Sequence, residues 1–83
     1  MTGAQRLKIL VIDDHEVVRR GVEHCLKEAF PHLEVGEAGT GQKGIAAVQQ
    51  ESWDLAIVDI SLPDQSGLEL LCELHRMAPR LPL

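Results

Sequence analysis

Three aspartates follow short apolar runs, and their positions could support chemistry at a single site. Asp13 and Asp14 come directly after residues 7–12 (LKILVI), and Asp59 lies near the end of residues 54–60 (DLAIVDI). Carboxylates that lie close together raise one another's pKa unless a cation neutralises them. Oxygen ligands suit Mg²⁺, which takes one or two carboxylates directly and keeps several waters. A carboxylate beside this ion can act as a nucleophile towards phosphorus and form an aspartyl phosphate.

Three strands are predicted, and two of them end in these acids. Residues 7–12 and 54–60 are almost wholly apolar, which is typical of parallel strands that are covered on both faces. Residues 33–38 (LEVGEA) alternate apolar and polar side chains, which indicates a strand with one wetter face. The carboxyl ends of parallel strands lie on one edge of a sheet, and ligands bind where the strand order reverses. The acids therefore converge if the second strand pairs on the other side of the first. The alternative is purely structural, because single acids often end strands or cap helices.

Helical spacing fills the intervals between the strands. Apolar residues that recur every three or four positions predict helices at about 16–29, 41–51 and 67–77. Thr40 can cap the second helix, and Ser66 stands in capping-box spacing to Glu69 at the start of the third. The apolar stripe of the first helix consists of Val18, Gly21, Val22, Cys25, Leu26 and Ala29. The alternation of strands and helices predicts an α/β fold, a doubly wound parallel sheet with helices on both faces.

Composition narrows the class of protein. The chain has 83 residues, enough for one small domain, and 13 acidic against 8 basic residues give a formal charge of −5. This balance argues against a nucleic-acid or anionic-membrane surface, where Lys and Arg dominate. Arg19 and Arg20 are interpreted as a solvated helix face, and Cys25 and Cys72 as small buried hydrophobes. No signal peptide or membrane span is visible, so we expect a cytoplasmic protein.

Two stretches carry a family resemblance. The chain resembles the receiver domain of bacterial two-component response regulators in two segments, VIDDHEVVRRGVEHCL and DLAIVDISLPDQSGLELL. The Asp-Asp-His at 13–15 and the Arg-Arg-Gly at 19–21 resemble the branch with a C-terminal LuxR-type helix-turn-helix (the LuxR/FixJ type). The resemblance implies a flavodoxin-like fold. It also implies that Pro63 and Gly67 shape the loop beside the site.

The resemblance implies a role for each acid. Asp59 would be the phosphoacceptor. Asp14 and Asp59 would bind Mg²⁺ directly, together with the backbone carbonyl of Ser61, and Asp13 would act largely through water. The phosphoryl group would come from a sensor histidine kinase. The chain would be a signalling domain rather than an enzyme, with at most Mg²⁺-dependent self-phosphorylation and dephosphorylation.

The resemblance also bears on the extent of the domain. The family uses a Ser or Thr after its fourth strand and a Lys after its fifth, and residues 1–83 would be the N-terminal part only, with a fourth strand starting at 81–83. DNA would be bound, and transcription regulated, only through an absent C-terminal domain. We expect the strand at 54–60 to keep an unpaired outer edge, and the chain to self-associate through this strand or the truncated face.

Other interpretations of these residues stay open. Residues 39–44 (GTGQKG) form a G-x-G-x-x-G that follows a strand and opens a helix, which suits dinucleotide binding. Such a turn should, however, follow the first strand, where Asp13 and Asp14 would repel a phosphate. Alternatively, a receiver fold could serve protein–protein contact alone, without phosphorylation. His15 could touch the acidic site or be a solvated residue at a helix start.

Overall fold

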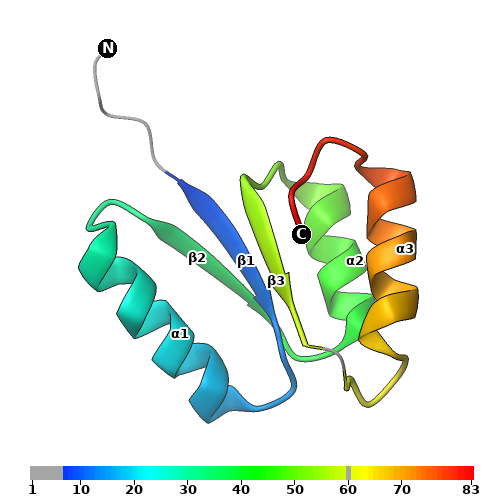
Figure 1. Ribbon diagram of the computed structural model, residues 1–83, viewed down its shortest axis with the longest axis horizontal. Helices are drawn as coiled ribbons and strands as arrows, with labels where there is room; N and C mark the ends of the chain where they lie inside the picture. Colours follow the sequence, from blue (N-terminus) through cyan, green and yellow to red (C-terminus); the bar gives the residue numbers. More distant parts are fainter. Residues whose placement is uncertain (1–6, 60) are drawn as a thin grey trace.

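The computed structural model describes residues 7–59 and 61–83 and contains one parallel sheet (Figure 1). Its strands are β1 (Lys8–Ile12), β2 (Glu34–Ala38) and β3 (Leu55–Val58). The strand order is β2-β1-β3, so β3 pairs on the other side of β1 from β2. This is the arrangement that brings the three acids to one edge of the sheet.

Three helices cover the two faces of this sheet, which confirms the doubly wound α/β fold. α1 (Glu16–Ala29) lies on one face, and α2 (Gly41–Gln50) and α3 (Gly67–Met77) lie on the other (Figure 1). Each strand begins one residue later than the sequence pattern suggested, and α2 ends one residue earlier. The expected end of the third strand, at residue 60, lies outside the described residues. Within the described part of the chain, no helix combines the length and apolar character that a membrane span requires.

The core has one half on each face of β1. Leu10 and Ile12 are fully buried and pack with Leu70 and Leu74 of α3. Ile9 and Val11 point to the opposite face, where Val22 and Leu26 of α1 pack against them. Each fully buried side chain of this size contributes roughly 1.5–3 kcal/mol to folding. The central position of β1 explains its almost wholly apolar sequence.

The predicted stripe of α1 is only partly correct. No residue of α1 is buried, and only Val22 and Leu26 pack against the core from this helix. Cys25 and Cys72 are both exposed, so the expectation of two buried thiols is wrong. The reason is geometric, because α1 contacts the sheet chiefly at β1 and one row of side chains suffices for that contact. On α3, similarly, Leu70 and Leu74 occupy the buried row, and Cys72 lies outside it.

Both predicted helix caps are present. The hydroxyl of Thr40 accepts a hydrogen bond from the backbone N–H of Lys43 at the start of α2. Ser66 and Glu69 form a reciprocal capping box at the start of α3. These caps satisfy N–H groups that have no partner inside a helix. They fix the first residues of α2 and α3, where the loops that follow β2 and β3 end.

The outer side of β3 is partly covered, which corrects the expectation of a bare edge. The carbonyl of Pro82 accepts a hydrogen bond of 3.0 Å from the backbone N–H of Ala56. Leu81 is buried in the core between the sheet and the helices. Residues 81–82 thus lie beside β3, and the apolar LPL sequence is explained by this contact.

Two glycines allow close packing that no other residue would permit. A Cβ at Gly44 of α2 would lie 2.5 Å from Cδ1 of Ile12, and a Cβ at Gly36 of β2 would lie 2.3 Å from the Trp53 ring. Trp53 is held in place by a hydrogen bond from its Nε1 to the carbonyl of Ala47. The glycine at 44 therefore brings α2 close to Ile12, the last residue of β1, directly before Asp13.

Gly44→Ala is expected to destabilise the fold although alanine favours helices. Ile12 is fully buried, so it has no room to move away from the added methyl group. Overpacking of a core costs roughly 1–3 kcal/mol, which exceeds the gain of about 1 kcal/mol from helix propensity. The matched control is Gly21→Ala in α1, where nothing lies within 4 Å of the new Cβ. Urea denaturation should give opposite signs for the two variants, and equal effects would contradict this account.

Candidate functional site

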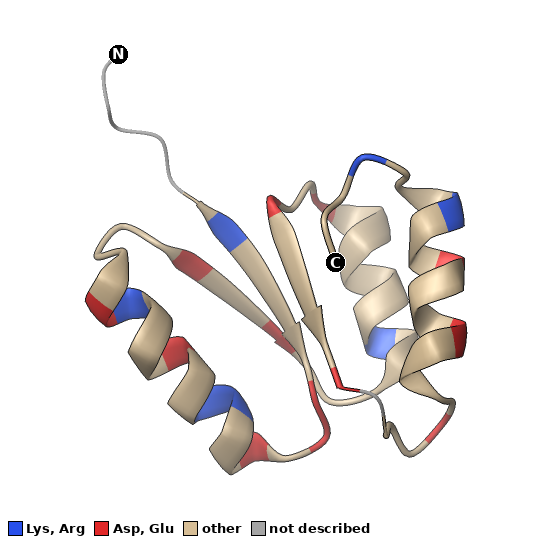
Figure 2. Cartoon of the chain, in the orientation of Figure 1, with Lys and Arg blue, Asp and Glu red and all other residues tan. Residues whose placement is uncertain are grey.

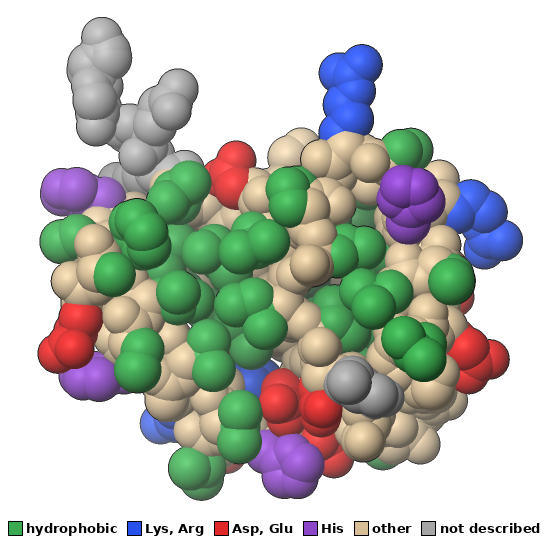
Figure 3. All heavy atoms as spheres, viewed as in Figure 1, with side chains coloured by type: hydrophobic (Ala, Val, Ile, Leu, Met, Phe, Trp, Pro, Cys, Tyr) green, Lys and Arg blue, Asp and Glu red, His purple; other side chains and the backbone are tan. Residues whose placement is uncertain are grey.

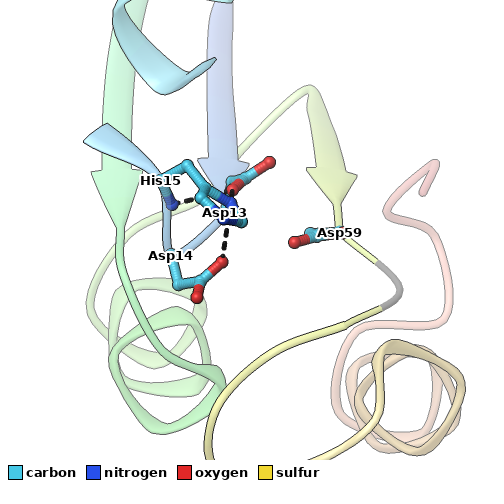
Figure 4. A group of neighbouring side chains, drawn as sticks. All are labelled: Asp13, Asp14, His15 and Asp59. Carbon is cyan, nitrogen blue, oxygen red and sulfur yellow. Dashed lines mark hydrogen bonds and ion pairs between the residues drawn. The ribbon is translucent and has the colours of Figure 1, made fainter. Parts of the chain in front are cut away.

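The three acids singled out in the sequence lie at the carboxyl edge of the sheet (Figure 2). Asp13 and Asp14 follow β1, and Asp59 follows β3. One potential ligand atom from each of these acids, together with a ring nitrogen of His15, forms a group in which all atoms lie within 4.8 Å of one another. Figure 4 shows the four side chains gathered around one space between the ends of β1 and β3. The sequence predicted the convergence of the acids.

Backbone hydrogen bonds fix the positions of Asp13 and Asp59. The N–H of Asp13 donates to the carbonyl of Ala38 at 3.0 Å, and the N–H of Asp59 donates to the carbonyl of Ile12 at 2.8 Å. These bonds extend the pairing of β1 by one residue on each side. The N–H of Ser61 then donates to Oδ1 of Asp59 at 3.2 Å. The Asp59 carboxylate is thus oriented by the loop that follows it.

His15 belongs to the site and is also solvated. Its Nδ1 lies 3.0 Å from Oδ1 of Asp13 and 2.9 Å from Oδ1 of Asp14, and 65% of its side chain is exposed. The hydrogen bond to Asp13, and then the negative charge of Asp14, raise the pKa of the His15 imidazole above its usual value. A protonated imidazole offsets part of the negative charge of the acids. The two alternatives left open for His15 therefore both hold.

Arg19 is a residue whose role the sequence did not reveal. Its Nε donates to Oε1 of Glu37 at 2.9 Å, and its guanidinium also donates to the backbone carbonyl of Asp13 at 2.6 Å. Only 17% of this side chain is exposed, against 71% for Arg20. Arg19 thus joins α1 to the ends of β1 and β2, and the expectation of a solvated Arg19 is wrong. An Arg-Arg pair gives no sign of which side chain turns inward.

The acidic group has the donor set that suits a hard divalent cation. Three carboxylates supply only oxygen atoms, and their crowding is unfavourable without a positive charge. The side chains of Asp13 and Asp14 are 16% and 33% exposed, so water can still reach them. Mg²⁺ keeps several of its waters when it binds proteins, and a half-open site meets this requirement.

The loop after Asp59 contains the remaining predicted residues. Ser61 forms a bridge with Ser66 across the loop, Pro63 is exposed between them, and Gly67 is buried at the start of α3. A further acid of this loop, Asp64, was not predicted to have a role. Its carboxylate accepts hydrogen bonds from the backbone N–H groups of Gly41 and Gln42 in α2. These two bonds lower the pKa of Asp64 below its usual value.

The structure gives the glycine-rich segment at 39–44 a packing role. Gly44 packs against Ile12, and the N–H groups at the start of α2 already bind the Asp64 carboxylate. In a dinucleotide site these N–H groups would face a phosphate. Asp64 occupies that place, and its charge would repel a phosphate.

Comparison with protein families gives a match over nearly the whole chain. Residues 9–83 match the family model described as response regulator receiver domain. The chain is 42% identical over 73 residues to the transcriptional activator protein ExaE of Pseudomonas putida, covering 88% of this chain and 34% of that protein. It is 43% identical over 76 residues to the DNA-binding transcriptional activator DevR/DosR of Mycobacterium tuberculosis, covering 90% and 35%. The chain thus spans about a third of the length of these curated relatives.

Solved structures with the same fold include a receiver domain protein (CheY-like) from Methanospirillum hungatei. It has a TM-score of 0.85 and 34% identity, over 93% of this chain and 60% of that one. TrrA of Thermotoga maritima, in complex with Mg²⁺-BeF, has a TM-score of 0.82 and 30% identity, over 88% and 62%. TrrA in complex with the histidine kinase ThkA has a TM-score of 0.83 and 29% identity, over 90% and 63%.

Proposed function

The chain belongs to the response regulator receiver domain family, and we propose that it accepts a phosphoryl group on Asp59. The observation that carries the proposal is the group of Asp13, Asp14, His15 and Asp59 at the carboxyl edge of the sheet. Asp59 follows β3, the neighbouring strand to β1, after which Asp13 and Asp14 stand. It is also the acid whose carboxylate is oriented by the N–H of Ser61.

In the proposed reaction an oxygen of the Asp59 carboxylate attacks the phosphorus of a phosphohistidine. A phosphorus–oxygen bond forms, the phosphorus–nitrogen bond breaks, and the histidine nitrogen leaves with the electron pair. Negative charge on the transferred group must be offset during the transfer. Placing Asp59 on a strand end, with its backbone bonded to Ile12, holds the nucleophile in one position.

We propose that Mg²⁺ takes part, held directly by Asp14, Asp59 and the backbone carbonyl of Ser61, with Asp13 acting through water. The donor set fits the ion, and TrrA, a structural relative, was solved in complex with Mg²⁺-BeF. When bound, the ion would offset charge on the phosphoryl oxygens. His15, with its raised pKa, contributes positive charge beside Asp13 and Asp14.

Mg²⁺ is expected to stabilise the folded chain, because it binds a group that exists only in the folded state. A concentration of about 100 times the dissociation constant would add roughly 2.7 kcal/mol to the free energy of unfolding. Thermal melts with and without the ion measure the effect. Asp14→Ala should remove the shift. An unchanged melting midpoint in the wild-type protein would count against the metal site.

Asp59→Asn is expected to abolish phosphorylation, since an amide is not a nucleophile towards phosphorus. The measurement is intact mass after incubation with Mg²⁺ and a small phosphodonor. Asp54→Asn is the matched control, because Asp54 stands at the other end of β3 and binds the backbone N–H of Lys8. The control should keep the added mass of one phosphoryl group. Labelling that persists in Asp59→Asn would refute the assignment.

The whole protein is proposed to be longer and to act in transcription. Two of its curated relatives, ExaE and DevR/DosR, are named transcriptional activators, and the chain spans about a third of their length. A sensor histidine kinase is the proposed donor, since TrrA has been solved with the histidine kinase ThkA. DNA would be bound by another part of the protein. If Asp59→Asn left all partner binding and output unchanged, the domain would instead serve protein–protein contact alone.

Self-association through β3 is also proposed, with a second copy as the partner. β3 is an edge strand of the described sheet whose outer side is only partly covered, by the contact of Ala56 with Pro82, and Leu55 and Ile57 are only half-buried beside the Ile9–Val11 half of the core. Hydrophobic side chains spread over the middle of the face seen in Figure 3. Exposed apolar surface beside a strand edge favours pairing between chains.

Light scattering after size exclusion is expected to give a mass that rises with protein concentration towards that of a dimer. Ile57→Lys should shift the equilibrium towards the monomer, because a charge at this position opposes burial. Circular dichroism checks that the variant is folded. A wild-type monomer that persists at all concentrations would exclude this contact.

A further inference from the structure

Asp64 links two segments that lie far apart in the sequence. Its Oδ1 accepts from the N–H of Gly41 at 2.8 Å, and its Oδ2 accepts from the N–H of Gln42 at 3.0 Å. Both donors are in the first turn of α2, where backbone N–H groups lack partners inside the helix. The loop between β3 and α3 is therefore tied to a helix that is not its sequence neighbour (Figure 1).

The same loop determines how the Asp59 carboxylate is held. At its start, the N–H of Ser61 donates to Oδ1 of Asp59. Within it, Ser61 and Ser66 form a bridge, and the capping box of Ser66 with Glu69 fixes its end. Asp64 lies between the two bridge residues and supplies the contact to α2. Displacement of the loop at Asp64 would shift Ser61, and with it the orientation of Asp59.

A second observation shows how closely the loop and α2 are packed. Gly41 is buried, and a Cβ there would lie 2.9 Å from Cγ of Gln65 and 3.2 Å from Oδ1 of Asp64. A side chain at 41 would push Gln65 and Asp64 away from the helix. The absence of a side chain at 41 therefore allows both oxygens of Asp64 to reach the helix.

We propose that Asp64 is a positioning residue for phosphorylation, which holds the loop segment of residues 61–66 against the N-terminus of α2. The inference rests on the proposed function of Asp59 and adds a residue that does not touch the phosphoryl group. A carboxylate suits this role better than an amide. It offers two acceptor oxygens, and its negative charge lies at the positive end of the helix dipole.

The test compares Asp64→Ala and Asp64→Asn with Thr40→Ala in the intact protein. Thr40 is the matched control because its hydroxyl caps the same helix by accepting the hydrogen bond of the Lys43 N–H, which belongs to the helix and not to the loop. Phosphorylation is followed over a range of concentrations of a small phosphodonor and of Mg²⁺, which separates the maximal rate from the apparent affinities. Melting curves report the loss of helix stability.

Asp64→Ala is expected to lower the maximal rate roughly tenfold, as is common for residues that orient a ligand or nucleophile indirectly. Asp64→Asn, which retains one acceptor oxygen, should fall between Asp64→Ala and the wild type. Thr40→Ala should lower the melting midpoint but keep the rate within about twofold of the wild type. A wild-type rate in Asp64→Ala, or an equal loss of rate in Thr40→Ala, would overturn the proposal.

A nuclear magnetic resonance measurement separates failure of this proposal from failure of the proposed function. In the wild type, the amide signals of Gly41 and Gln42 should titrate with Asp64, and the midpoint should lie below the usual aspartate pKa of 3.8. In Asp64→Ala, the amide signal of Ser61 should shift, whether or not Asp59 is ever phosphorylated. An unmoved Ser61 signal would refute positioning. If the Ser61 signal shifts in Asp64→Ala but the wild type is never phosphorylated, the proposed function is refuted and the positioning by Asp64 is not.

The pH dependence of stability gives an independent check. Because the folded-state pKa of Asp64 is depressed, its contribution is fully present above the unfolded pKa and is lost as pH falls through the folded pKa. The melting midpoint of the wild type should therefore fall more than that of Asp64→Asn as the pH drops below about 4. Parallel curves for the two proteins would mean that the carboxylate makes no such contact in solution.

Discussion

Parallel pairing of β1 with β3 determines where the acidic site forms. The register places Ile12 beside Val58, so the next residues, Asp13 and Asp59, leave the sheet side by side at its carboxyl edge. A slip of one residue would turn every side chain of β3 to the opposite face of the sheet. Ala56 would then leave the half of the core that it shares with Leu10, and Asp59 would no longer lie beside the acid pair. The apolar core therefore specifies the geometry of the polar site.

This geometry holds the carboxylates of Asp13, Asp14 and Asp59 close together. Like charges that are held together must be offset, and the described chain supplies several groups that do so. His15 bonds to both members of the acid pair, Arg19 donates to the backbone of Asp13, and the N–H of Ser61 donates to Asp59. These contacts are partial, since the carboxylates stay accessible to water. A partly neutralised, half-open group of acids is suited to reversible binding of a cation and a phosphoryl group.

The start of α2 connects this site to the loop beyond it. Two of its N–H groups bind Asp64, and another binds the hydroxyl of Thr40. The glycines at 41 and 44 bring the helix close to the loop and to Ile12, respectively. A sequence pattern that resembles a phosphate-binding turn thus serves internal packing, with a side-chain carboxylate in the place that a bound anion would take.

The sequence by itself determined the element types, the doubly wound parallel fold, both helix caps and the convergence of Asp13, Asp14 and Asp59. These features follow from local periodicity and from the rule that parallel strands share one carboxyl edge. The tertiary structure decided which side of a helix is covered, so Cys25 and Cys72 are exposed although their spacing is apolar. It also decided that Arg19 turns inward to Glu37 and that Asp64 binds α2, 22 and 23 residues away in the sequence. Contacts of this kind depend on the packing of whole elements, and no local pattern in the sequence encodes them.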